Sequence, residues 1–376
     1  MKWRDCRLGD VLTLKRGHDL PSDARHDGDI PVVSSSGITG YHSEAKATPP
    51  GVVTGRYGTI GEVFYLEQDY WPLNTALYVI DFKGTHPKFA AYFLKNALAG
   101  YQSDKAAVPG VDRNVLHEIK VRAPEPRIQQ RIAETLSAYD DLMENNRRRM
   151  ALLEESARLL YREWFVRLRF PGHEHARITN GIPEGWERKT LGEVAELNRA
   201  SLSSSFDGEI EYVDIASVIP GQITETTHYA FCDAPSRARR IVRHGDIIWS
   251  CVRPNRRSHA VIWSPPENLI ASTGFAVITP NAVPTTFLNF ATTSDDFVGY
   301  LENHARGAAY PAVVAKDFER AKLLIPSKRL LDDFNDLVEP TFDQTHNLRQ
   351  QNQKLRAARD LLLPKLMSGE MSVETE

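Results

Sequence analysis

The residues of this 376-residue chain that could do chemistry are polar side chains in short glycine-containing or turn-forming stretches. In the first half they are Ser35, Ser36, Arg56, Tyr57 and Thr59, and in the second half Arg253, Asn255, Arg256 and Arg257. An arginine can bridge O6 and N7 of guanine, an asparagine can bridge N6 and N7 of adenine, and a hydroxyl serves either base. Glycine lets a backbone approach its ligand closely. These residue types favour loops that contact DNA; the alternative is ordinary β-turns with solvated arginines.

A second polar group precedes each of two long helical patterns. It comprises Lys105 and Arg113 in the first half, and Arg306, Tyr310 and Lys316 in the second. Cations and hydroxyls in such places are typical of contacts to phosphate oxygens, which position a duplex without reading its sequence. Ordinary surface residues explain them equally well, so both interpretations stay open.

Catalytic motifs are absent from the sequence. It has no glycine-rich phosphate loop ending in Lys-Ser or Lys-Thr, and no Asn-Pro-Pro-aromatic motif to hold a flipped base for methyl transfer. His173-Glu174-His175 has the side chains of metal ligands, but a solvated stretch of a charged linker is the better interpretation. We therefore predict a chain that is not an enzyme and binds no metal or cofactor of its own.

Composition limits the remaining classes. Hydrophobic residues at 41% and charged residues at 25% are ordinary for a folded soluble protein. No apolar run approaches the ~20 residues that cross a bilayer, and no signal peptide is visible, so we expect no membrane partner. Cys6, Cys232 and Cys251 lack metal or disulfide spacing, as expected in a reducing cytoplasm. The net charge of −3 means that DNA binding would need local basic patches or a partner.

Two long helical patterns must position these loops. Residues 127–169 contain no proline or glycine, and their apolar residues recur at spacings of three and four. The stretch from Leu330 to Leu362 shows the same alternation. Such a stripe predicts a long amphipathic helix that needs a partner helix. We expect Pro340 to kink or interrupt the second helix and Pro364 to end its packed part.

The approaches to the two helices repeat. The stretch Ala106–Val111 runs to Pro124, and Ala308–Val313 runs to Pro326, with each pair of positions 202 residues apart. Between the two openings, WRDCRLGDVLTL and WERKTLGEVAEL, the shift is 183, so the second half carries inserted residues. Short β-rich stretches bounded by Gly, Pro or Ser fill each half. The sequence therefore predicts an internal repeat, in which one domain-and-helix unit occurs twice.

We therefore predict an α+β fold of two similar α+β domains separated by two long α-helices. Repeats related by a pseudo-twofold axis would place these helices antiparallel, as a coiled coil. The predicted boundaries are 1–124 for the first domain, 125–170 for the first helix, 171–326 for the second domain and 327–376 for the second helix.

This order of domain, helix, domain and helix resembles the DNA-specificity subunit of type I restriction–modification enzymes. The stretches that carry the resemblance are SSSGITGY from Ser34, TGRYGTIG from Thr54, IQQRIAETLSAYDDLMENN from Ile128 and RDLLLPKLMSGE from Arg359. The resemblance implies that the domains are target-recognition domains, each reading one half of a bipartite DNA site. It also implies that the helices are spacers that set the gap between the half-sites.

The same resemblance implies the partners. Catalysis would lie in two methylation subunits that use S-adenosylmethionine, and in restriction subunits that use ATP and Mg to translocate DNA. Helix residues outside the seam would dock the methylation subunits, and the candidates are Trp164, Phe165, Leu361 and Leu366. A coiled-coil scaffold whose domains bind proteins remains the alternative, and a stand-alone modification enzyme is disfavoured by the missing motifs.

Overall fold

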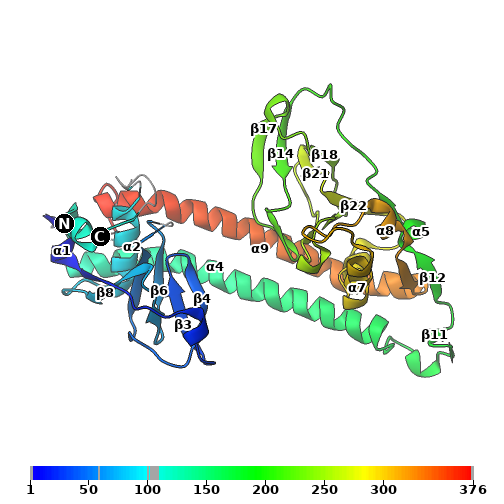
Figure 1. The fold of residues 1–376 in the computed structure, drawn as a ribbon, viewed down its shortest axis with the longest axis horizontal. Helices are drawn as coiled ribbons and strands as arrows, with labels where there is room; N and C mark the ends of the chain where they lie inside the picture. Colours follow the sequence, from blue (N-terminus) through cyan, green and yellow to red (C-terminus); the bar gives the residue numbers. More distant parts are fainter. Residues whose placement is uncertain (1–2, 58–59, 100, 102–109, 374–376) are drawn as a thin grey trace. The chain divides into compact units, whose positions relative to one another are not determined.

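The computed structural model describes residues 3–57, 60–99, 101 and 110–373 (Figure 1). The chain forms two compact units, each of which contains one domain and part of both long helices. Unit 1 comprises Met1–Asn145 and Gln351–Glu376, and unit 2 comprises Asn146–Gln350. The long helices are α4 at Pro126–Tyr161 and α9 at Lys328–Ser368. In the described part of the chain, no helix combines the length and the apolar character that a membrane span requires.

The domain of unit 1 is built on three small sheets. A four-stranded antiparallel sheet has the order β2-β8-β5-β6, a three-stranded sheet has the order β4-β3-β7, and β1 pairs with β9. The strands are β1 Trp3–Arg7, β2 Thr13–Arg16, β3 Ile30–Ser34, β4 Gly37–His42, β5 Gly51–Gly55, β6 Val63–Leu66, β7 Trp71–Pro72, β8 Ala76–Asp81 and β9 Lys120–Pro124. The short helices are α1 Leu8–Val11, η1 Ser22–Ala24, α2 Pro87–Ala97 and α3 Arg113–His117.

Unit 2 repeats this plan with additions. Its main sheets have the orders β13-β22-β19-β20 and β17-β14-β21-β18, and β12 pairs with β23. The strands are β10 Ile178–Thr179, β11 Ile182–Pro183, β12 Glu187–Thr190, β13 Ala195–Leu197, β14 Glu209–Val213, β15 Val218–Ile219, β16 Gln222–Ile223, β17 Thr227–Ala230, β18 Ala238–Ile241, β19 Ile247–Ser250, β20 His259–Val261, β21 Leu269–Ser272, β22 Phe275–Pro280 and β23 Lys322–Ile325. The helical segments are η2 Arg162–Val166, η3 His173–His175, α5 Leu191–Val194, η4 Phe231–Asp233, η5 Pro254–Arg256, α6 Thr285–Thr292, α7 Asp295–His304 and α8 Ala315–Arg320.

Strand pairing confirms that the chain is an internal repeat. In unit 1, β3 pairs antiparallel with β4 and parallel with β7; in unit 2, β14 pairs antiparallel with β17 and parallel with β21. The central strands β5 and β19 each lie between two antiparallel neighbours. Strand β18 has no counterpart in the sheet β4-β3-β7. The α+β fold with a pair of long helices is as predicted, and the inserted residues build an extra strand.

Within each unit, the segments of α4 and α9 pack antiparallel. In unit 1, Asp140 of α4 meets Arg359 of α9, whereas the later Met143 meets the earlier Asn352. In unit 2, Glu154 pairs with Arg349 at 2.8 Å, and Tyr161 lies 6.2 Å from Phe334 between ring centroids. Residue numbers rise along α4 as they fall along α9 in both units, which is the antiparallel arrangement.

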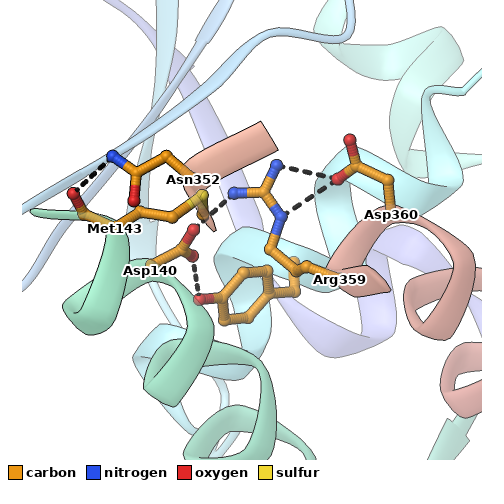
Figure 2. A network of polar contacts seen from close by, with 6 residues as sticks. Asp140, Met143, Asn352, Arg359 and Asp360 are labelled. Atoms are coloured by element: carbon orange, nitrogen blue, oxygen red, sulfur yellow. Dashed lines mark hydrogen bonds and ion pairs between the residues drawn. The ribbon is translucent and has the colours of Figure 1, made fainter. Parts of the chain in front are cut away.

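A polar network fixes this pairing in unit 1 (Figure 2). The Asp140 carboxylate accepts hydrogen bonds from Arg359 and from the hydroxyl of Tyr92 on α2. Arg359, whose side chain is 15% exposed, also donates to Asp360 at 2.7 and 3.0 Å. Burial raises the pKa of Tyr92, and its bond to Asp140 raises it further, so the hydroxyl stays a donor. Charge-assisted bonds of this kind are stronger than neutral ones, and here they hold a domain helix to both long helices.

The expectations that the prolines interrupt the second helix and that Pro364 ends its packed part are wrong. Helix α9 runs unbroken from Lys328 to Ser368 through both residues. Beyond Pro364, Leu366 and Met367 are 1% and 4% exposed in the core of unit 1. A proline removes one helical hydrogen bond and crowds the preceding turn. Burial of the neighbouring apolar side chains offsets that cost, so packing overrides the local preference.

The aromatic core of unit 2 gives a test of this packing. Phe334 is 0% exposed, and its ring centroid lies 5.0 Å from that of Phe165 and 5.9 Å from that of Trp164. We predict that Phe334→Ala lowers the free energy of unfolding by about 3–5 kcal/mol, through lost contacts and a cavity. The matched change Leu337→Ala, at a residue that is 56% exposed on the same helix, should cost about 0.5 kcal/mol or less. Denaturant unfolding followed by tryptophan fluorescence measures both; equal losses would contradict the prediction.

Candidate nucleic-acid interface

In unit 1, the arginine of the first glycine-rich loop is held by backbone on both sides. Strand β5 ends at Gly55, and the amide of Arg56 donates to the Thr75 carbonyl at 2.9 Å. The Arg56 carbonyl accepts from the Val111 amide at 2.9 Å. The guanidinium carbon lies 4.7 Å from the centroid of the Tyr57 ring. The arginine therefore projects from a fixed main chain and lies against an aromatic face.

Gly110 makes this arrangement possible. It forms a β-bridge with Tyr57, and a Cβ at position 110 would lie 2.6 Å from Cε1 of that ring. Any side chain there would displace the ring on which the Arg56 guanidinium rests. Arg113, which begins α3 three residues later, is exposed. The structure thus brings Arg56, Tyr57 and the segment leading to Arg113 together.

Unit 2 has the same arrangement, built from different residues. Strand β19 ends at Ser250, and the Arg253 amide donates to the Pro311 carbonyl at 2.7 Å. The Arg253 guanidinium carbon lies 4.5 Å from the centroid of the Tyr310 ring, and Nη2 donates to the Ala309 carbonyl at 3.2 Å. Tyr310 is 69% exposed. Here the aromatic ring comes from the segment before α8, whereas in unit 1 it follows the arginine directly.

The two loops are therefore equivalent in topology and in chemistry. Each places an arginine just after the central strand of the main sheet, against the segment that leads to α3 or α8. Stacking on a ring contributes about 0.5–1 kcal/mol at an exposed site. More usefully, it fixes the plane of the guanidinium while its edge keeps N–H donors for a ligand.

The loop of unit 2 carries two backbone outliers. Arg253 and Arg257, which flank η5, have φ angles of +51° and +53°. Non-glycine residues rarely adopt this left-handed conformation, which costs on the order of 1–3 kcal/mol and persists only where the surroundings enforce it. Asn255 and Arg256 lie exposed between them. Such a turn presents two hydrogen-bonding side chains on a rigid support.

Arg257 contributes to that support. Its guanidinium forms an ion pair with Asp295 at the start of α7, and the hydrogen bond from Arg257 lowers the pKa of this carboxyl. Arg257 is thus already engaged within the chain, whereas Asn255 and Arg256 extend from the turn. The sequence alone could not separate the anchoring arginine from its neighbours.

His259 is a residue of this site that the sequence did not reveal. Its Nδ1 lies 2.7 Å from the Arg257 carbonyl oxygen, and its ring stacks on Trp249 with centroids 5.0 Å apart. Burial lowers the pKa of His259 to about 4, so the ring is neutral and Nδ1–H can donate to that carbonyl. A single histidine in a β-strand belongs to no recognisable motif, so no pattern of residues points to it.

The remaining candidates lie on exposed turns. Ser35 and Ser36 belong to the β3–β4 turn, where the Ser34 hydroxyl oxygen accepts from the Ser36 amide at 3.2 Å. Arg306 is exposed and its amide donates to the Ala312 carbonyl at 2.9 Å, while Lys316 is exposed in the first turn of α8. Thr59 and Lys105 lie outside the described residues. Within the described residues, no group of three His, Cys, Asp or Glu side chains could hold a metal ion.

The docking candidates need correction. Trp164 and Phe165 are each 8% exposed and belong to the core of unit 2, and Leu366 is 1% exposed in the core of unit 1. The helix ends supply the apolar layer of their own domains, so these three side chains offer no docking surface. Leu361, at 69% exposed, does lie on the surface.

Comparison with known proteins shows what this chain is similar to. Residues 1–155 match the model of the type I restriction modification DNA specificity domain. The chain is 26% identical over 297 residues to the type I restriction enzyme MjaIX specificity subunit of Methanocaldococcus jannaschii, covering 76% of this chain and 67% of that one. It is 25% identical over 178 residues to the HindI specificity subunit of Haemophilus influenzae, covering 45% and 38%.

The fold agrees with this class. The solved structure of a type I restriction–modification S subunit from M. genitalium superposes with a TM-score of 0.60 at 18% identity, covering 97% of this chain and 96% of that one. The resemblance predicted from the sequence motifs is therefore confirmed: the chain is similar to type I specificity subunits. Since the relatives are named specificity subunits, the prediction of a non-catalytic chain is also supported.

The neutral state of His259 gives a pH test of the loop. The folded pKa is about 4 and the ordinary value is 6.5, so the unfolded chain binds a proton between these values that the folded chain does not. The contribution of neutral His259 to the free energy of unfolding is fully present above pH 6.5 and is lost as pH falls towards 4. The loss between pH 7 and pH 5 amounts to about 2 kcal/mol.

We predict that His259→Gln shows a smaller loss of unfolding free energy between pH 7 and pH 5 than the unsubstituted protein. The control is His175→Gln, because His175 is exposed. Urea unfolding at both pH values measures the difference. Parallel pH profiles for all three proteins would show that His259 is not buried in the neutral form.

Proposed function

We propose that this chain is the sequence-specific DNA-recognition subunit of a type I restriction–modification complex, each of whose domains reads one half of a bipartite DNA site. The observation that carries the proposal is the repeated arginine–aromatic loop. Arg56 and Arg253 follow equivalent strands and lie on tyrosine rings at 4.7 and 4.5 Å. A bidentate guanidinium is the commonest specific contact to guanine in the major groove.

Two such loops on two non-identical repeats suit an asymmetric, two-part site. The loop of unit 1 offers Arg56 with Tyr57, whereas that of unit 2 adds Asn255 and Arg256 on a rigid turn. Asparagine pairs best with adenine and arginine with guanine, so the two domains would prefer different half-sites. Arg113, Arg306 and Lys316 flank the loops and would contact phosphates.

The long helices would set the distance between the half-sites. We assign the target-recognition domains to 1–124 and 171–326, and the spacer helices to 125–170 and 327–376. Helix α4 has 36 residues, which at ~1.5 Å each gives roughly 54 Å, or on the order of 16 base pairs. Paired amphipathic helices are stiff compared with a flexible linker, so their length would act as a ruler.

The reaction would belong to partners. We propose that two methylation subunits supply S-adenosylmethionine chemistry and that restriction subunits supply ATP- and Mg-dependent translocation, in the cytoplasm. Leu361, at 69% exposed, and Leu142, at 52% exposed on α4 in the same unit, are apolar side chains that a methylation subunit would contact. The net charge of −3 is consistent with DNA binding through local patches inside a larger assembly.

A coiled-coil scaffold with two protein-binding domains is the less favoured alternative. It explains the helices, but it gives no reason for an arginine held on an aromatic ring at equivalent positions of both repeats. Protein-binding surfaces of that kind would also need larger exposed apolar patches around the loops.

The two loops can be tested against each other. We predict that Arg56→Ala weakens binding to the cognate duplex by about 1–3 kcal/mol and relaxes preference in one half-site only. Arg253→Ala, the matched variant, should relax the other half-site and leave the first intact. Binding of the complex with its methylation subunits to duplex libraries randomised in one half at a time measures both. An equal loss on cognate and random duplexes would make these arginines phosphate contacts instead.

The ruler is tested by lengthening both helices. Seven residues, about two turns, inserted near Asn146 would add ~10.5 Å and keep the apolar stripe nearly in phase. A matched insertion between Gln344 and Gln351 would keep the helices paired. We predict modification of the same two half-sites at a gap wider by about three base pairs. An unchanged gap in a stable, active double insertion would show that something other than the helices spaces the domains.

A further inference from the structure

The segment 236–244 of unit 2, which contains strand β18 at Ala238–Ile241, carries a dense run of positive charge. Residues 236–244 read SRARRIVRH, with arginines at 237, 239, 240 and 243 and no acidic residue. In unit 1, the place beside β7 is taken by a single bridge between Ala47 and Tyr70, in the stretch SEAKATPP with one acid and one base. In unit 2, Ala238 and Ile241 of β18 pack into a hydrophobic cluster, which explains the strand, but that packing does not involve the exposed Arg237 and Arg243.

The arginines are not needed to protect a sheet edge. Charged residues often block an edge strand whose backbone would otherwise pair with another chain. Here, residues 200–202 already cover the outer side of β18: the Leu202 amide donates to the Arg239 carbonyl at 2.8 Å, and the Ile241 amide donates to the Ala200 carbonyl at 3.2 Å. Another explanation is therefore required for the charge.

The side chains of Arg239 and Arg240 contact other residues of unit 2, whereas Arg237 and Arg243 are exposed. The Arg239 guanidinium carbon lies 4.5 Å from the Phe231 ring centroid, and Arg240 Nη1 donates to the Ser201 hydroxyl at 3.3 Å. Arg237 and Arg243 are exposed, and within the described residues their hydrogen bonds are made by backbone atoms. The acid that follows them, Asp246, is 2% exposed; it accepts a hydrogen bond from the Arg243 amide at 2.7 Å, and the positive charge of Arg243 opposes the rise that burial causes in the pKa of that carboxyl.

This charged strand is continuous with the Arg253 loop. The Thr273 amide donates to the Arg237 carbonyl at 2.8 Å, and the next residue, Gly274, accepts from the Cys251 amide at 2.9 Å. One β-turn thus links the start of β18 to the segment that enters the loop. Arg240 lies near the same segment, since its charge opposes the rise that burial causes in the pKa of Cys251.

From this geometry we infer a second anion-binding surface in unit 2, formed by Arg237 and Arg243 with Arg239 beside them, that holds the phosphate backbone of the duplex flanking the half-site read by the Arg253 loop. The inference rests on the proposed function. Arg237 lies in the turn before β18 and Arg243 follows the end of that strand. Within the described residues, neither guanidinium is oriented by a ring or by a side-chain hydrogen bond, and mobile exposed cations suit phosphate oxygens rather than base edges. The surface would give the second domain more sequence-independent affinity than the first.

The test is the salt dependence of binding by the complex with its methylation subunits, using a cognate duplex and a random duplex of equal length. The double variant Arg237→Ala/Arg243→Ala should weaken both by the same factor, up to roughly eightfold per lost contact at ~0.1 M salt. Its plot of log affinity against log salt should be shallower by about 0.9 per contact. Arg237→Lys/Arg243→Lys should recover most of the loss, because a phosphate accepts a point charge.

The control is Arg177→Ala/Arg188→Ala, which also removes two positive charges from exposed positions of unit 2, but outside the segment 236–244. The inference would be overturned if Arg237→Ala/Arg243→Ala kept the wild-type affinity and salt slope. It would also be overturned if that variant lost no more affinity for DNA than the control. Either result would leave the proposed function intact. A loss confined to the cognate duplex would also overturn the inference, since these residues would then read bases. Absence of salt-dependent binding by the unsubstituted complex would overturn the proposed function itself. Circular dichroism and thermal melting of each variant verify that the strand still folds.

Discussion

The packing of each long-helix segment into the core of its own domain is the constraint on which the rest of the structure depends. In unit 2, Trp164 and Phe165 meet Phe334 within the same cluster as Leu191, Trp249 and Ile278 of the domain. In unit 1, Ile128 and Leu136 share a cluster with Leu363, Leu366 and Phe89. A domain that shares its core with two helices cannot rotate about them without breaking that core. Each recognition loop is therefore oriented by the helices as firmly as by its own sheet.

The sequence predicted the architecture because its strongest signals are long-range repeats and periodic apolar stripes. The repeated approaches to Pro124 and Pro326, and the absence of Pro and Gly from 127–169, were enough to place α4 and α9. The predictions made from the sequence were wrong where tertiary packing overrides the local preference of a residue. Pro364 looks like a helix end, yet burial of Leu366 and Met367 carries α9 past it. Trp164 and Phe165 were assigned to a docking surface because a stripe shows which residues share a face, but not which neighbour covers that face.

The loops show the same difference between what residue types reveal and what only the structure reveals. Arg56 and Arg253 were recognised from their residue type and glycine-rich or turn-forming context. Their shared geometry was not recognisable, because Tyr57 adjoins its arginine in sequence whereas Tyr310 lies more than fifty residues from Arg253. Similarly, Arg253, Asn255, Arg256 and Arg257 form one polar run in the sequence. Only the positive φ angles and the Asp295 ion pair separate the residues that build the turn from those that it presents.

The repeat also shows how one scaffold can carry two different arginine-bearing loops. Both units keep the elements that shape the core. The short helices α1 and α5 correspond, and so do the parallel strand pairs β3–β7 and β14–β21. Differences include the origin of the aromatic ring, the strained turn at Arg253–Arg257, and strand β18, whose Ala238 and Ile241 add to a hydrophobic cluster of unit 2. Since surface loops tolerate change at little cost to stability, the side chains that the loops present can diverge between the units while each unit keeps its own core. Under the proposed function, a chain with a net charge of −3 would bind DNA through local groups of arginines such as those of the Arg253 loop and the segment 236–244.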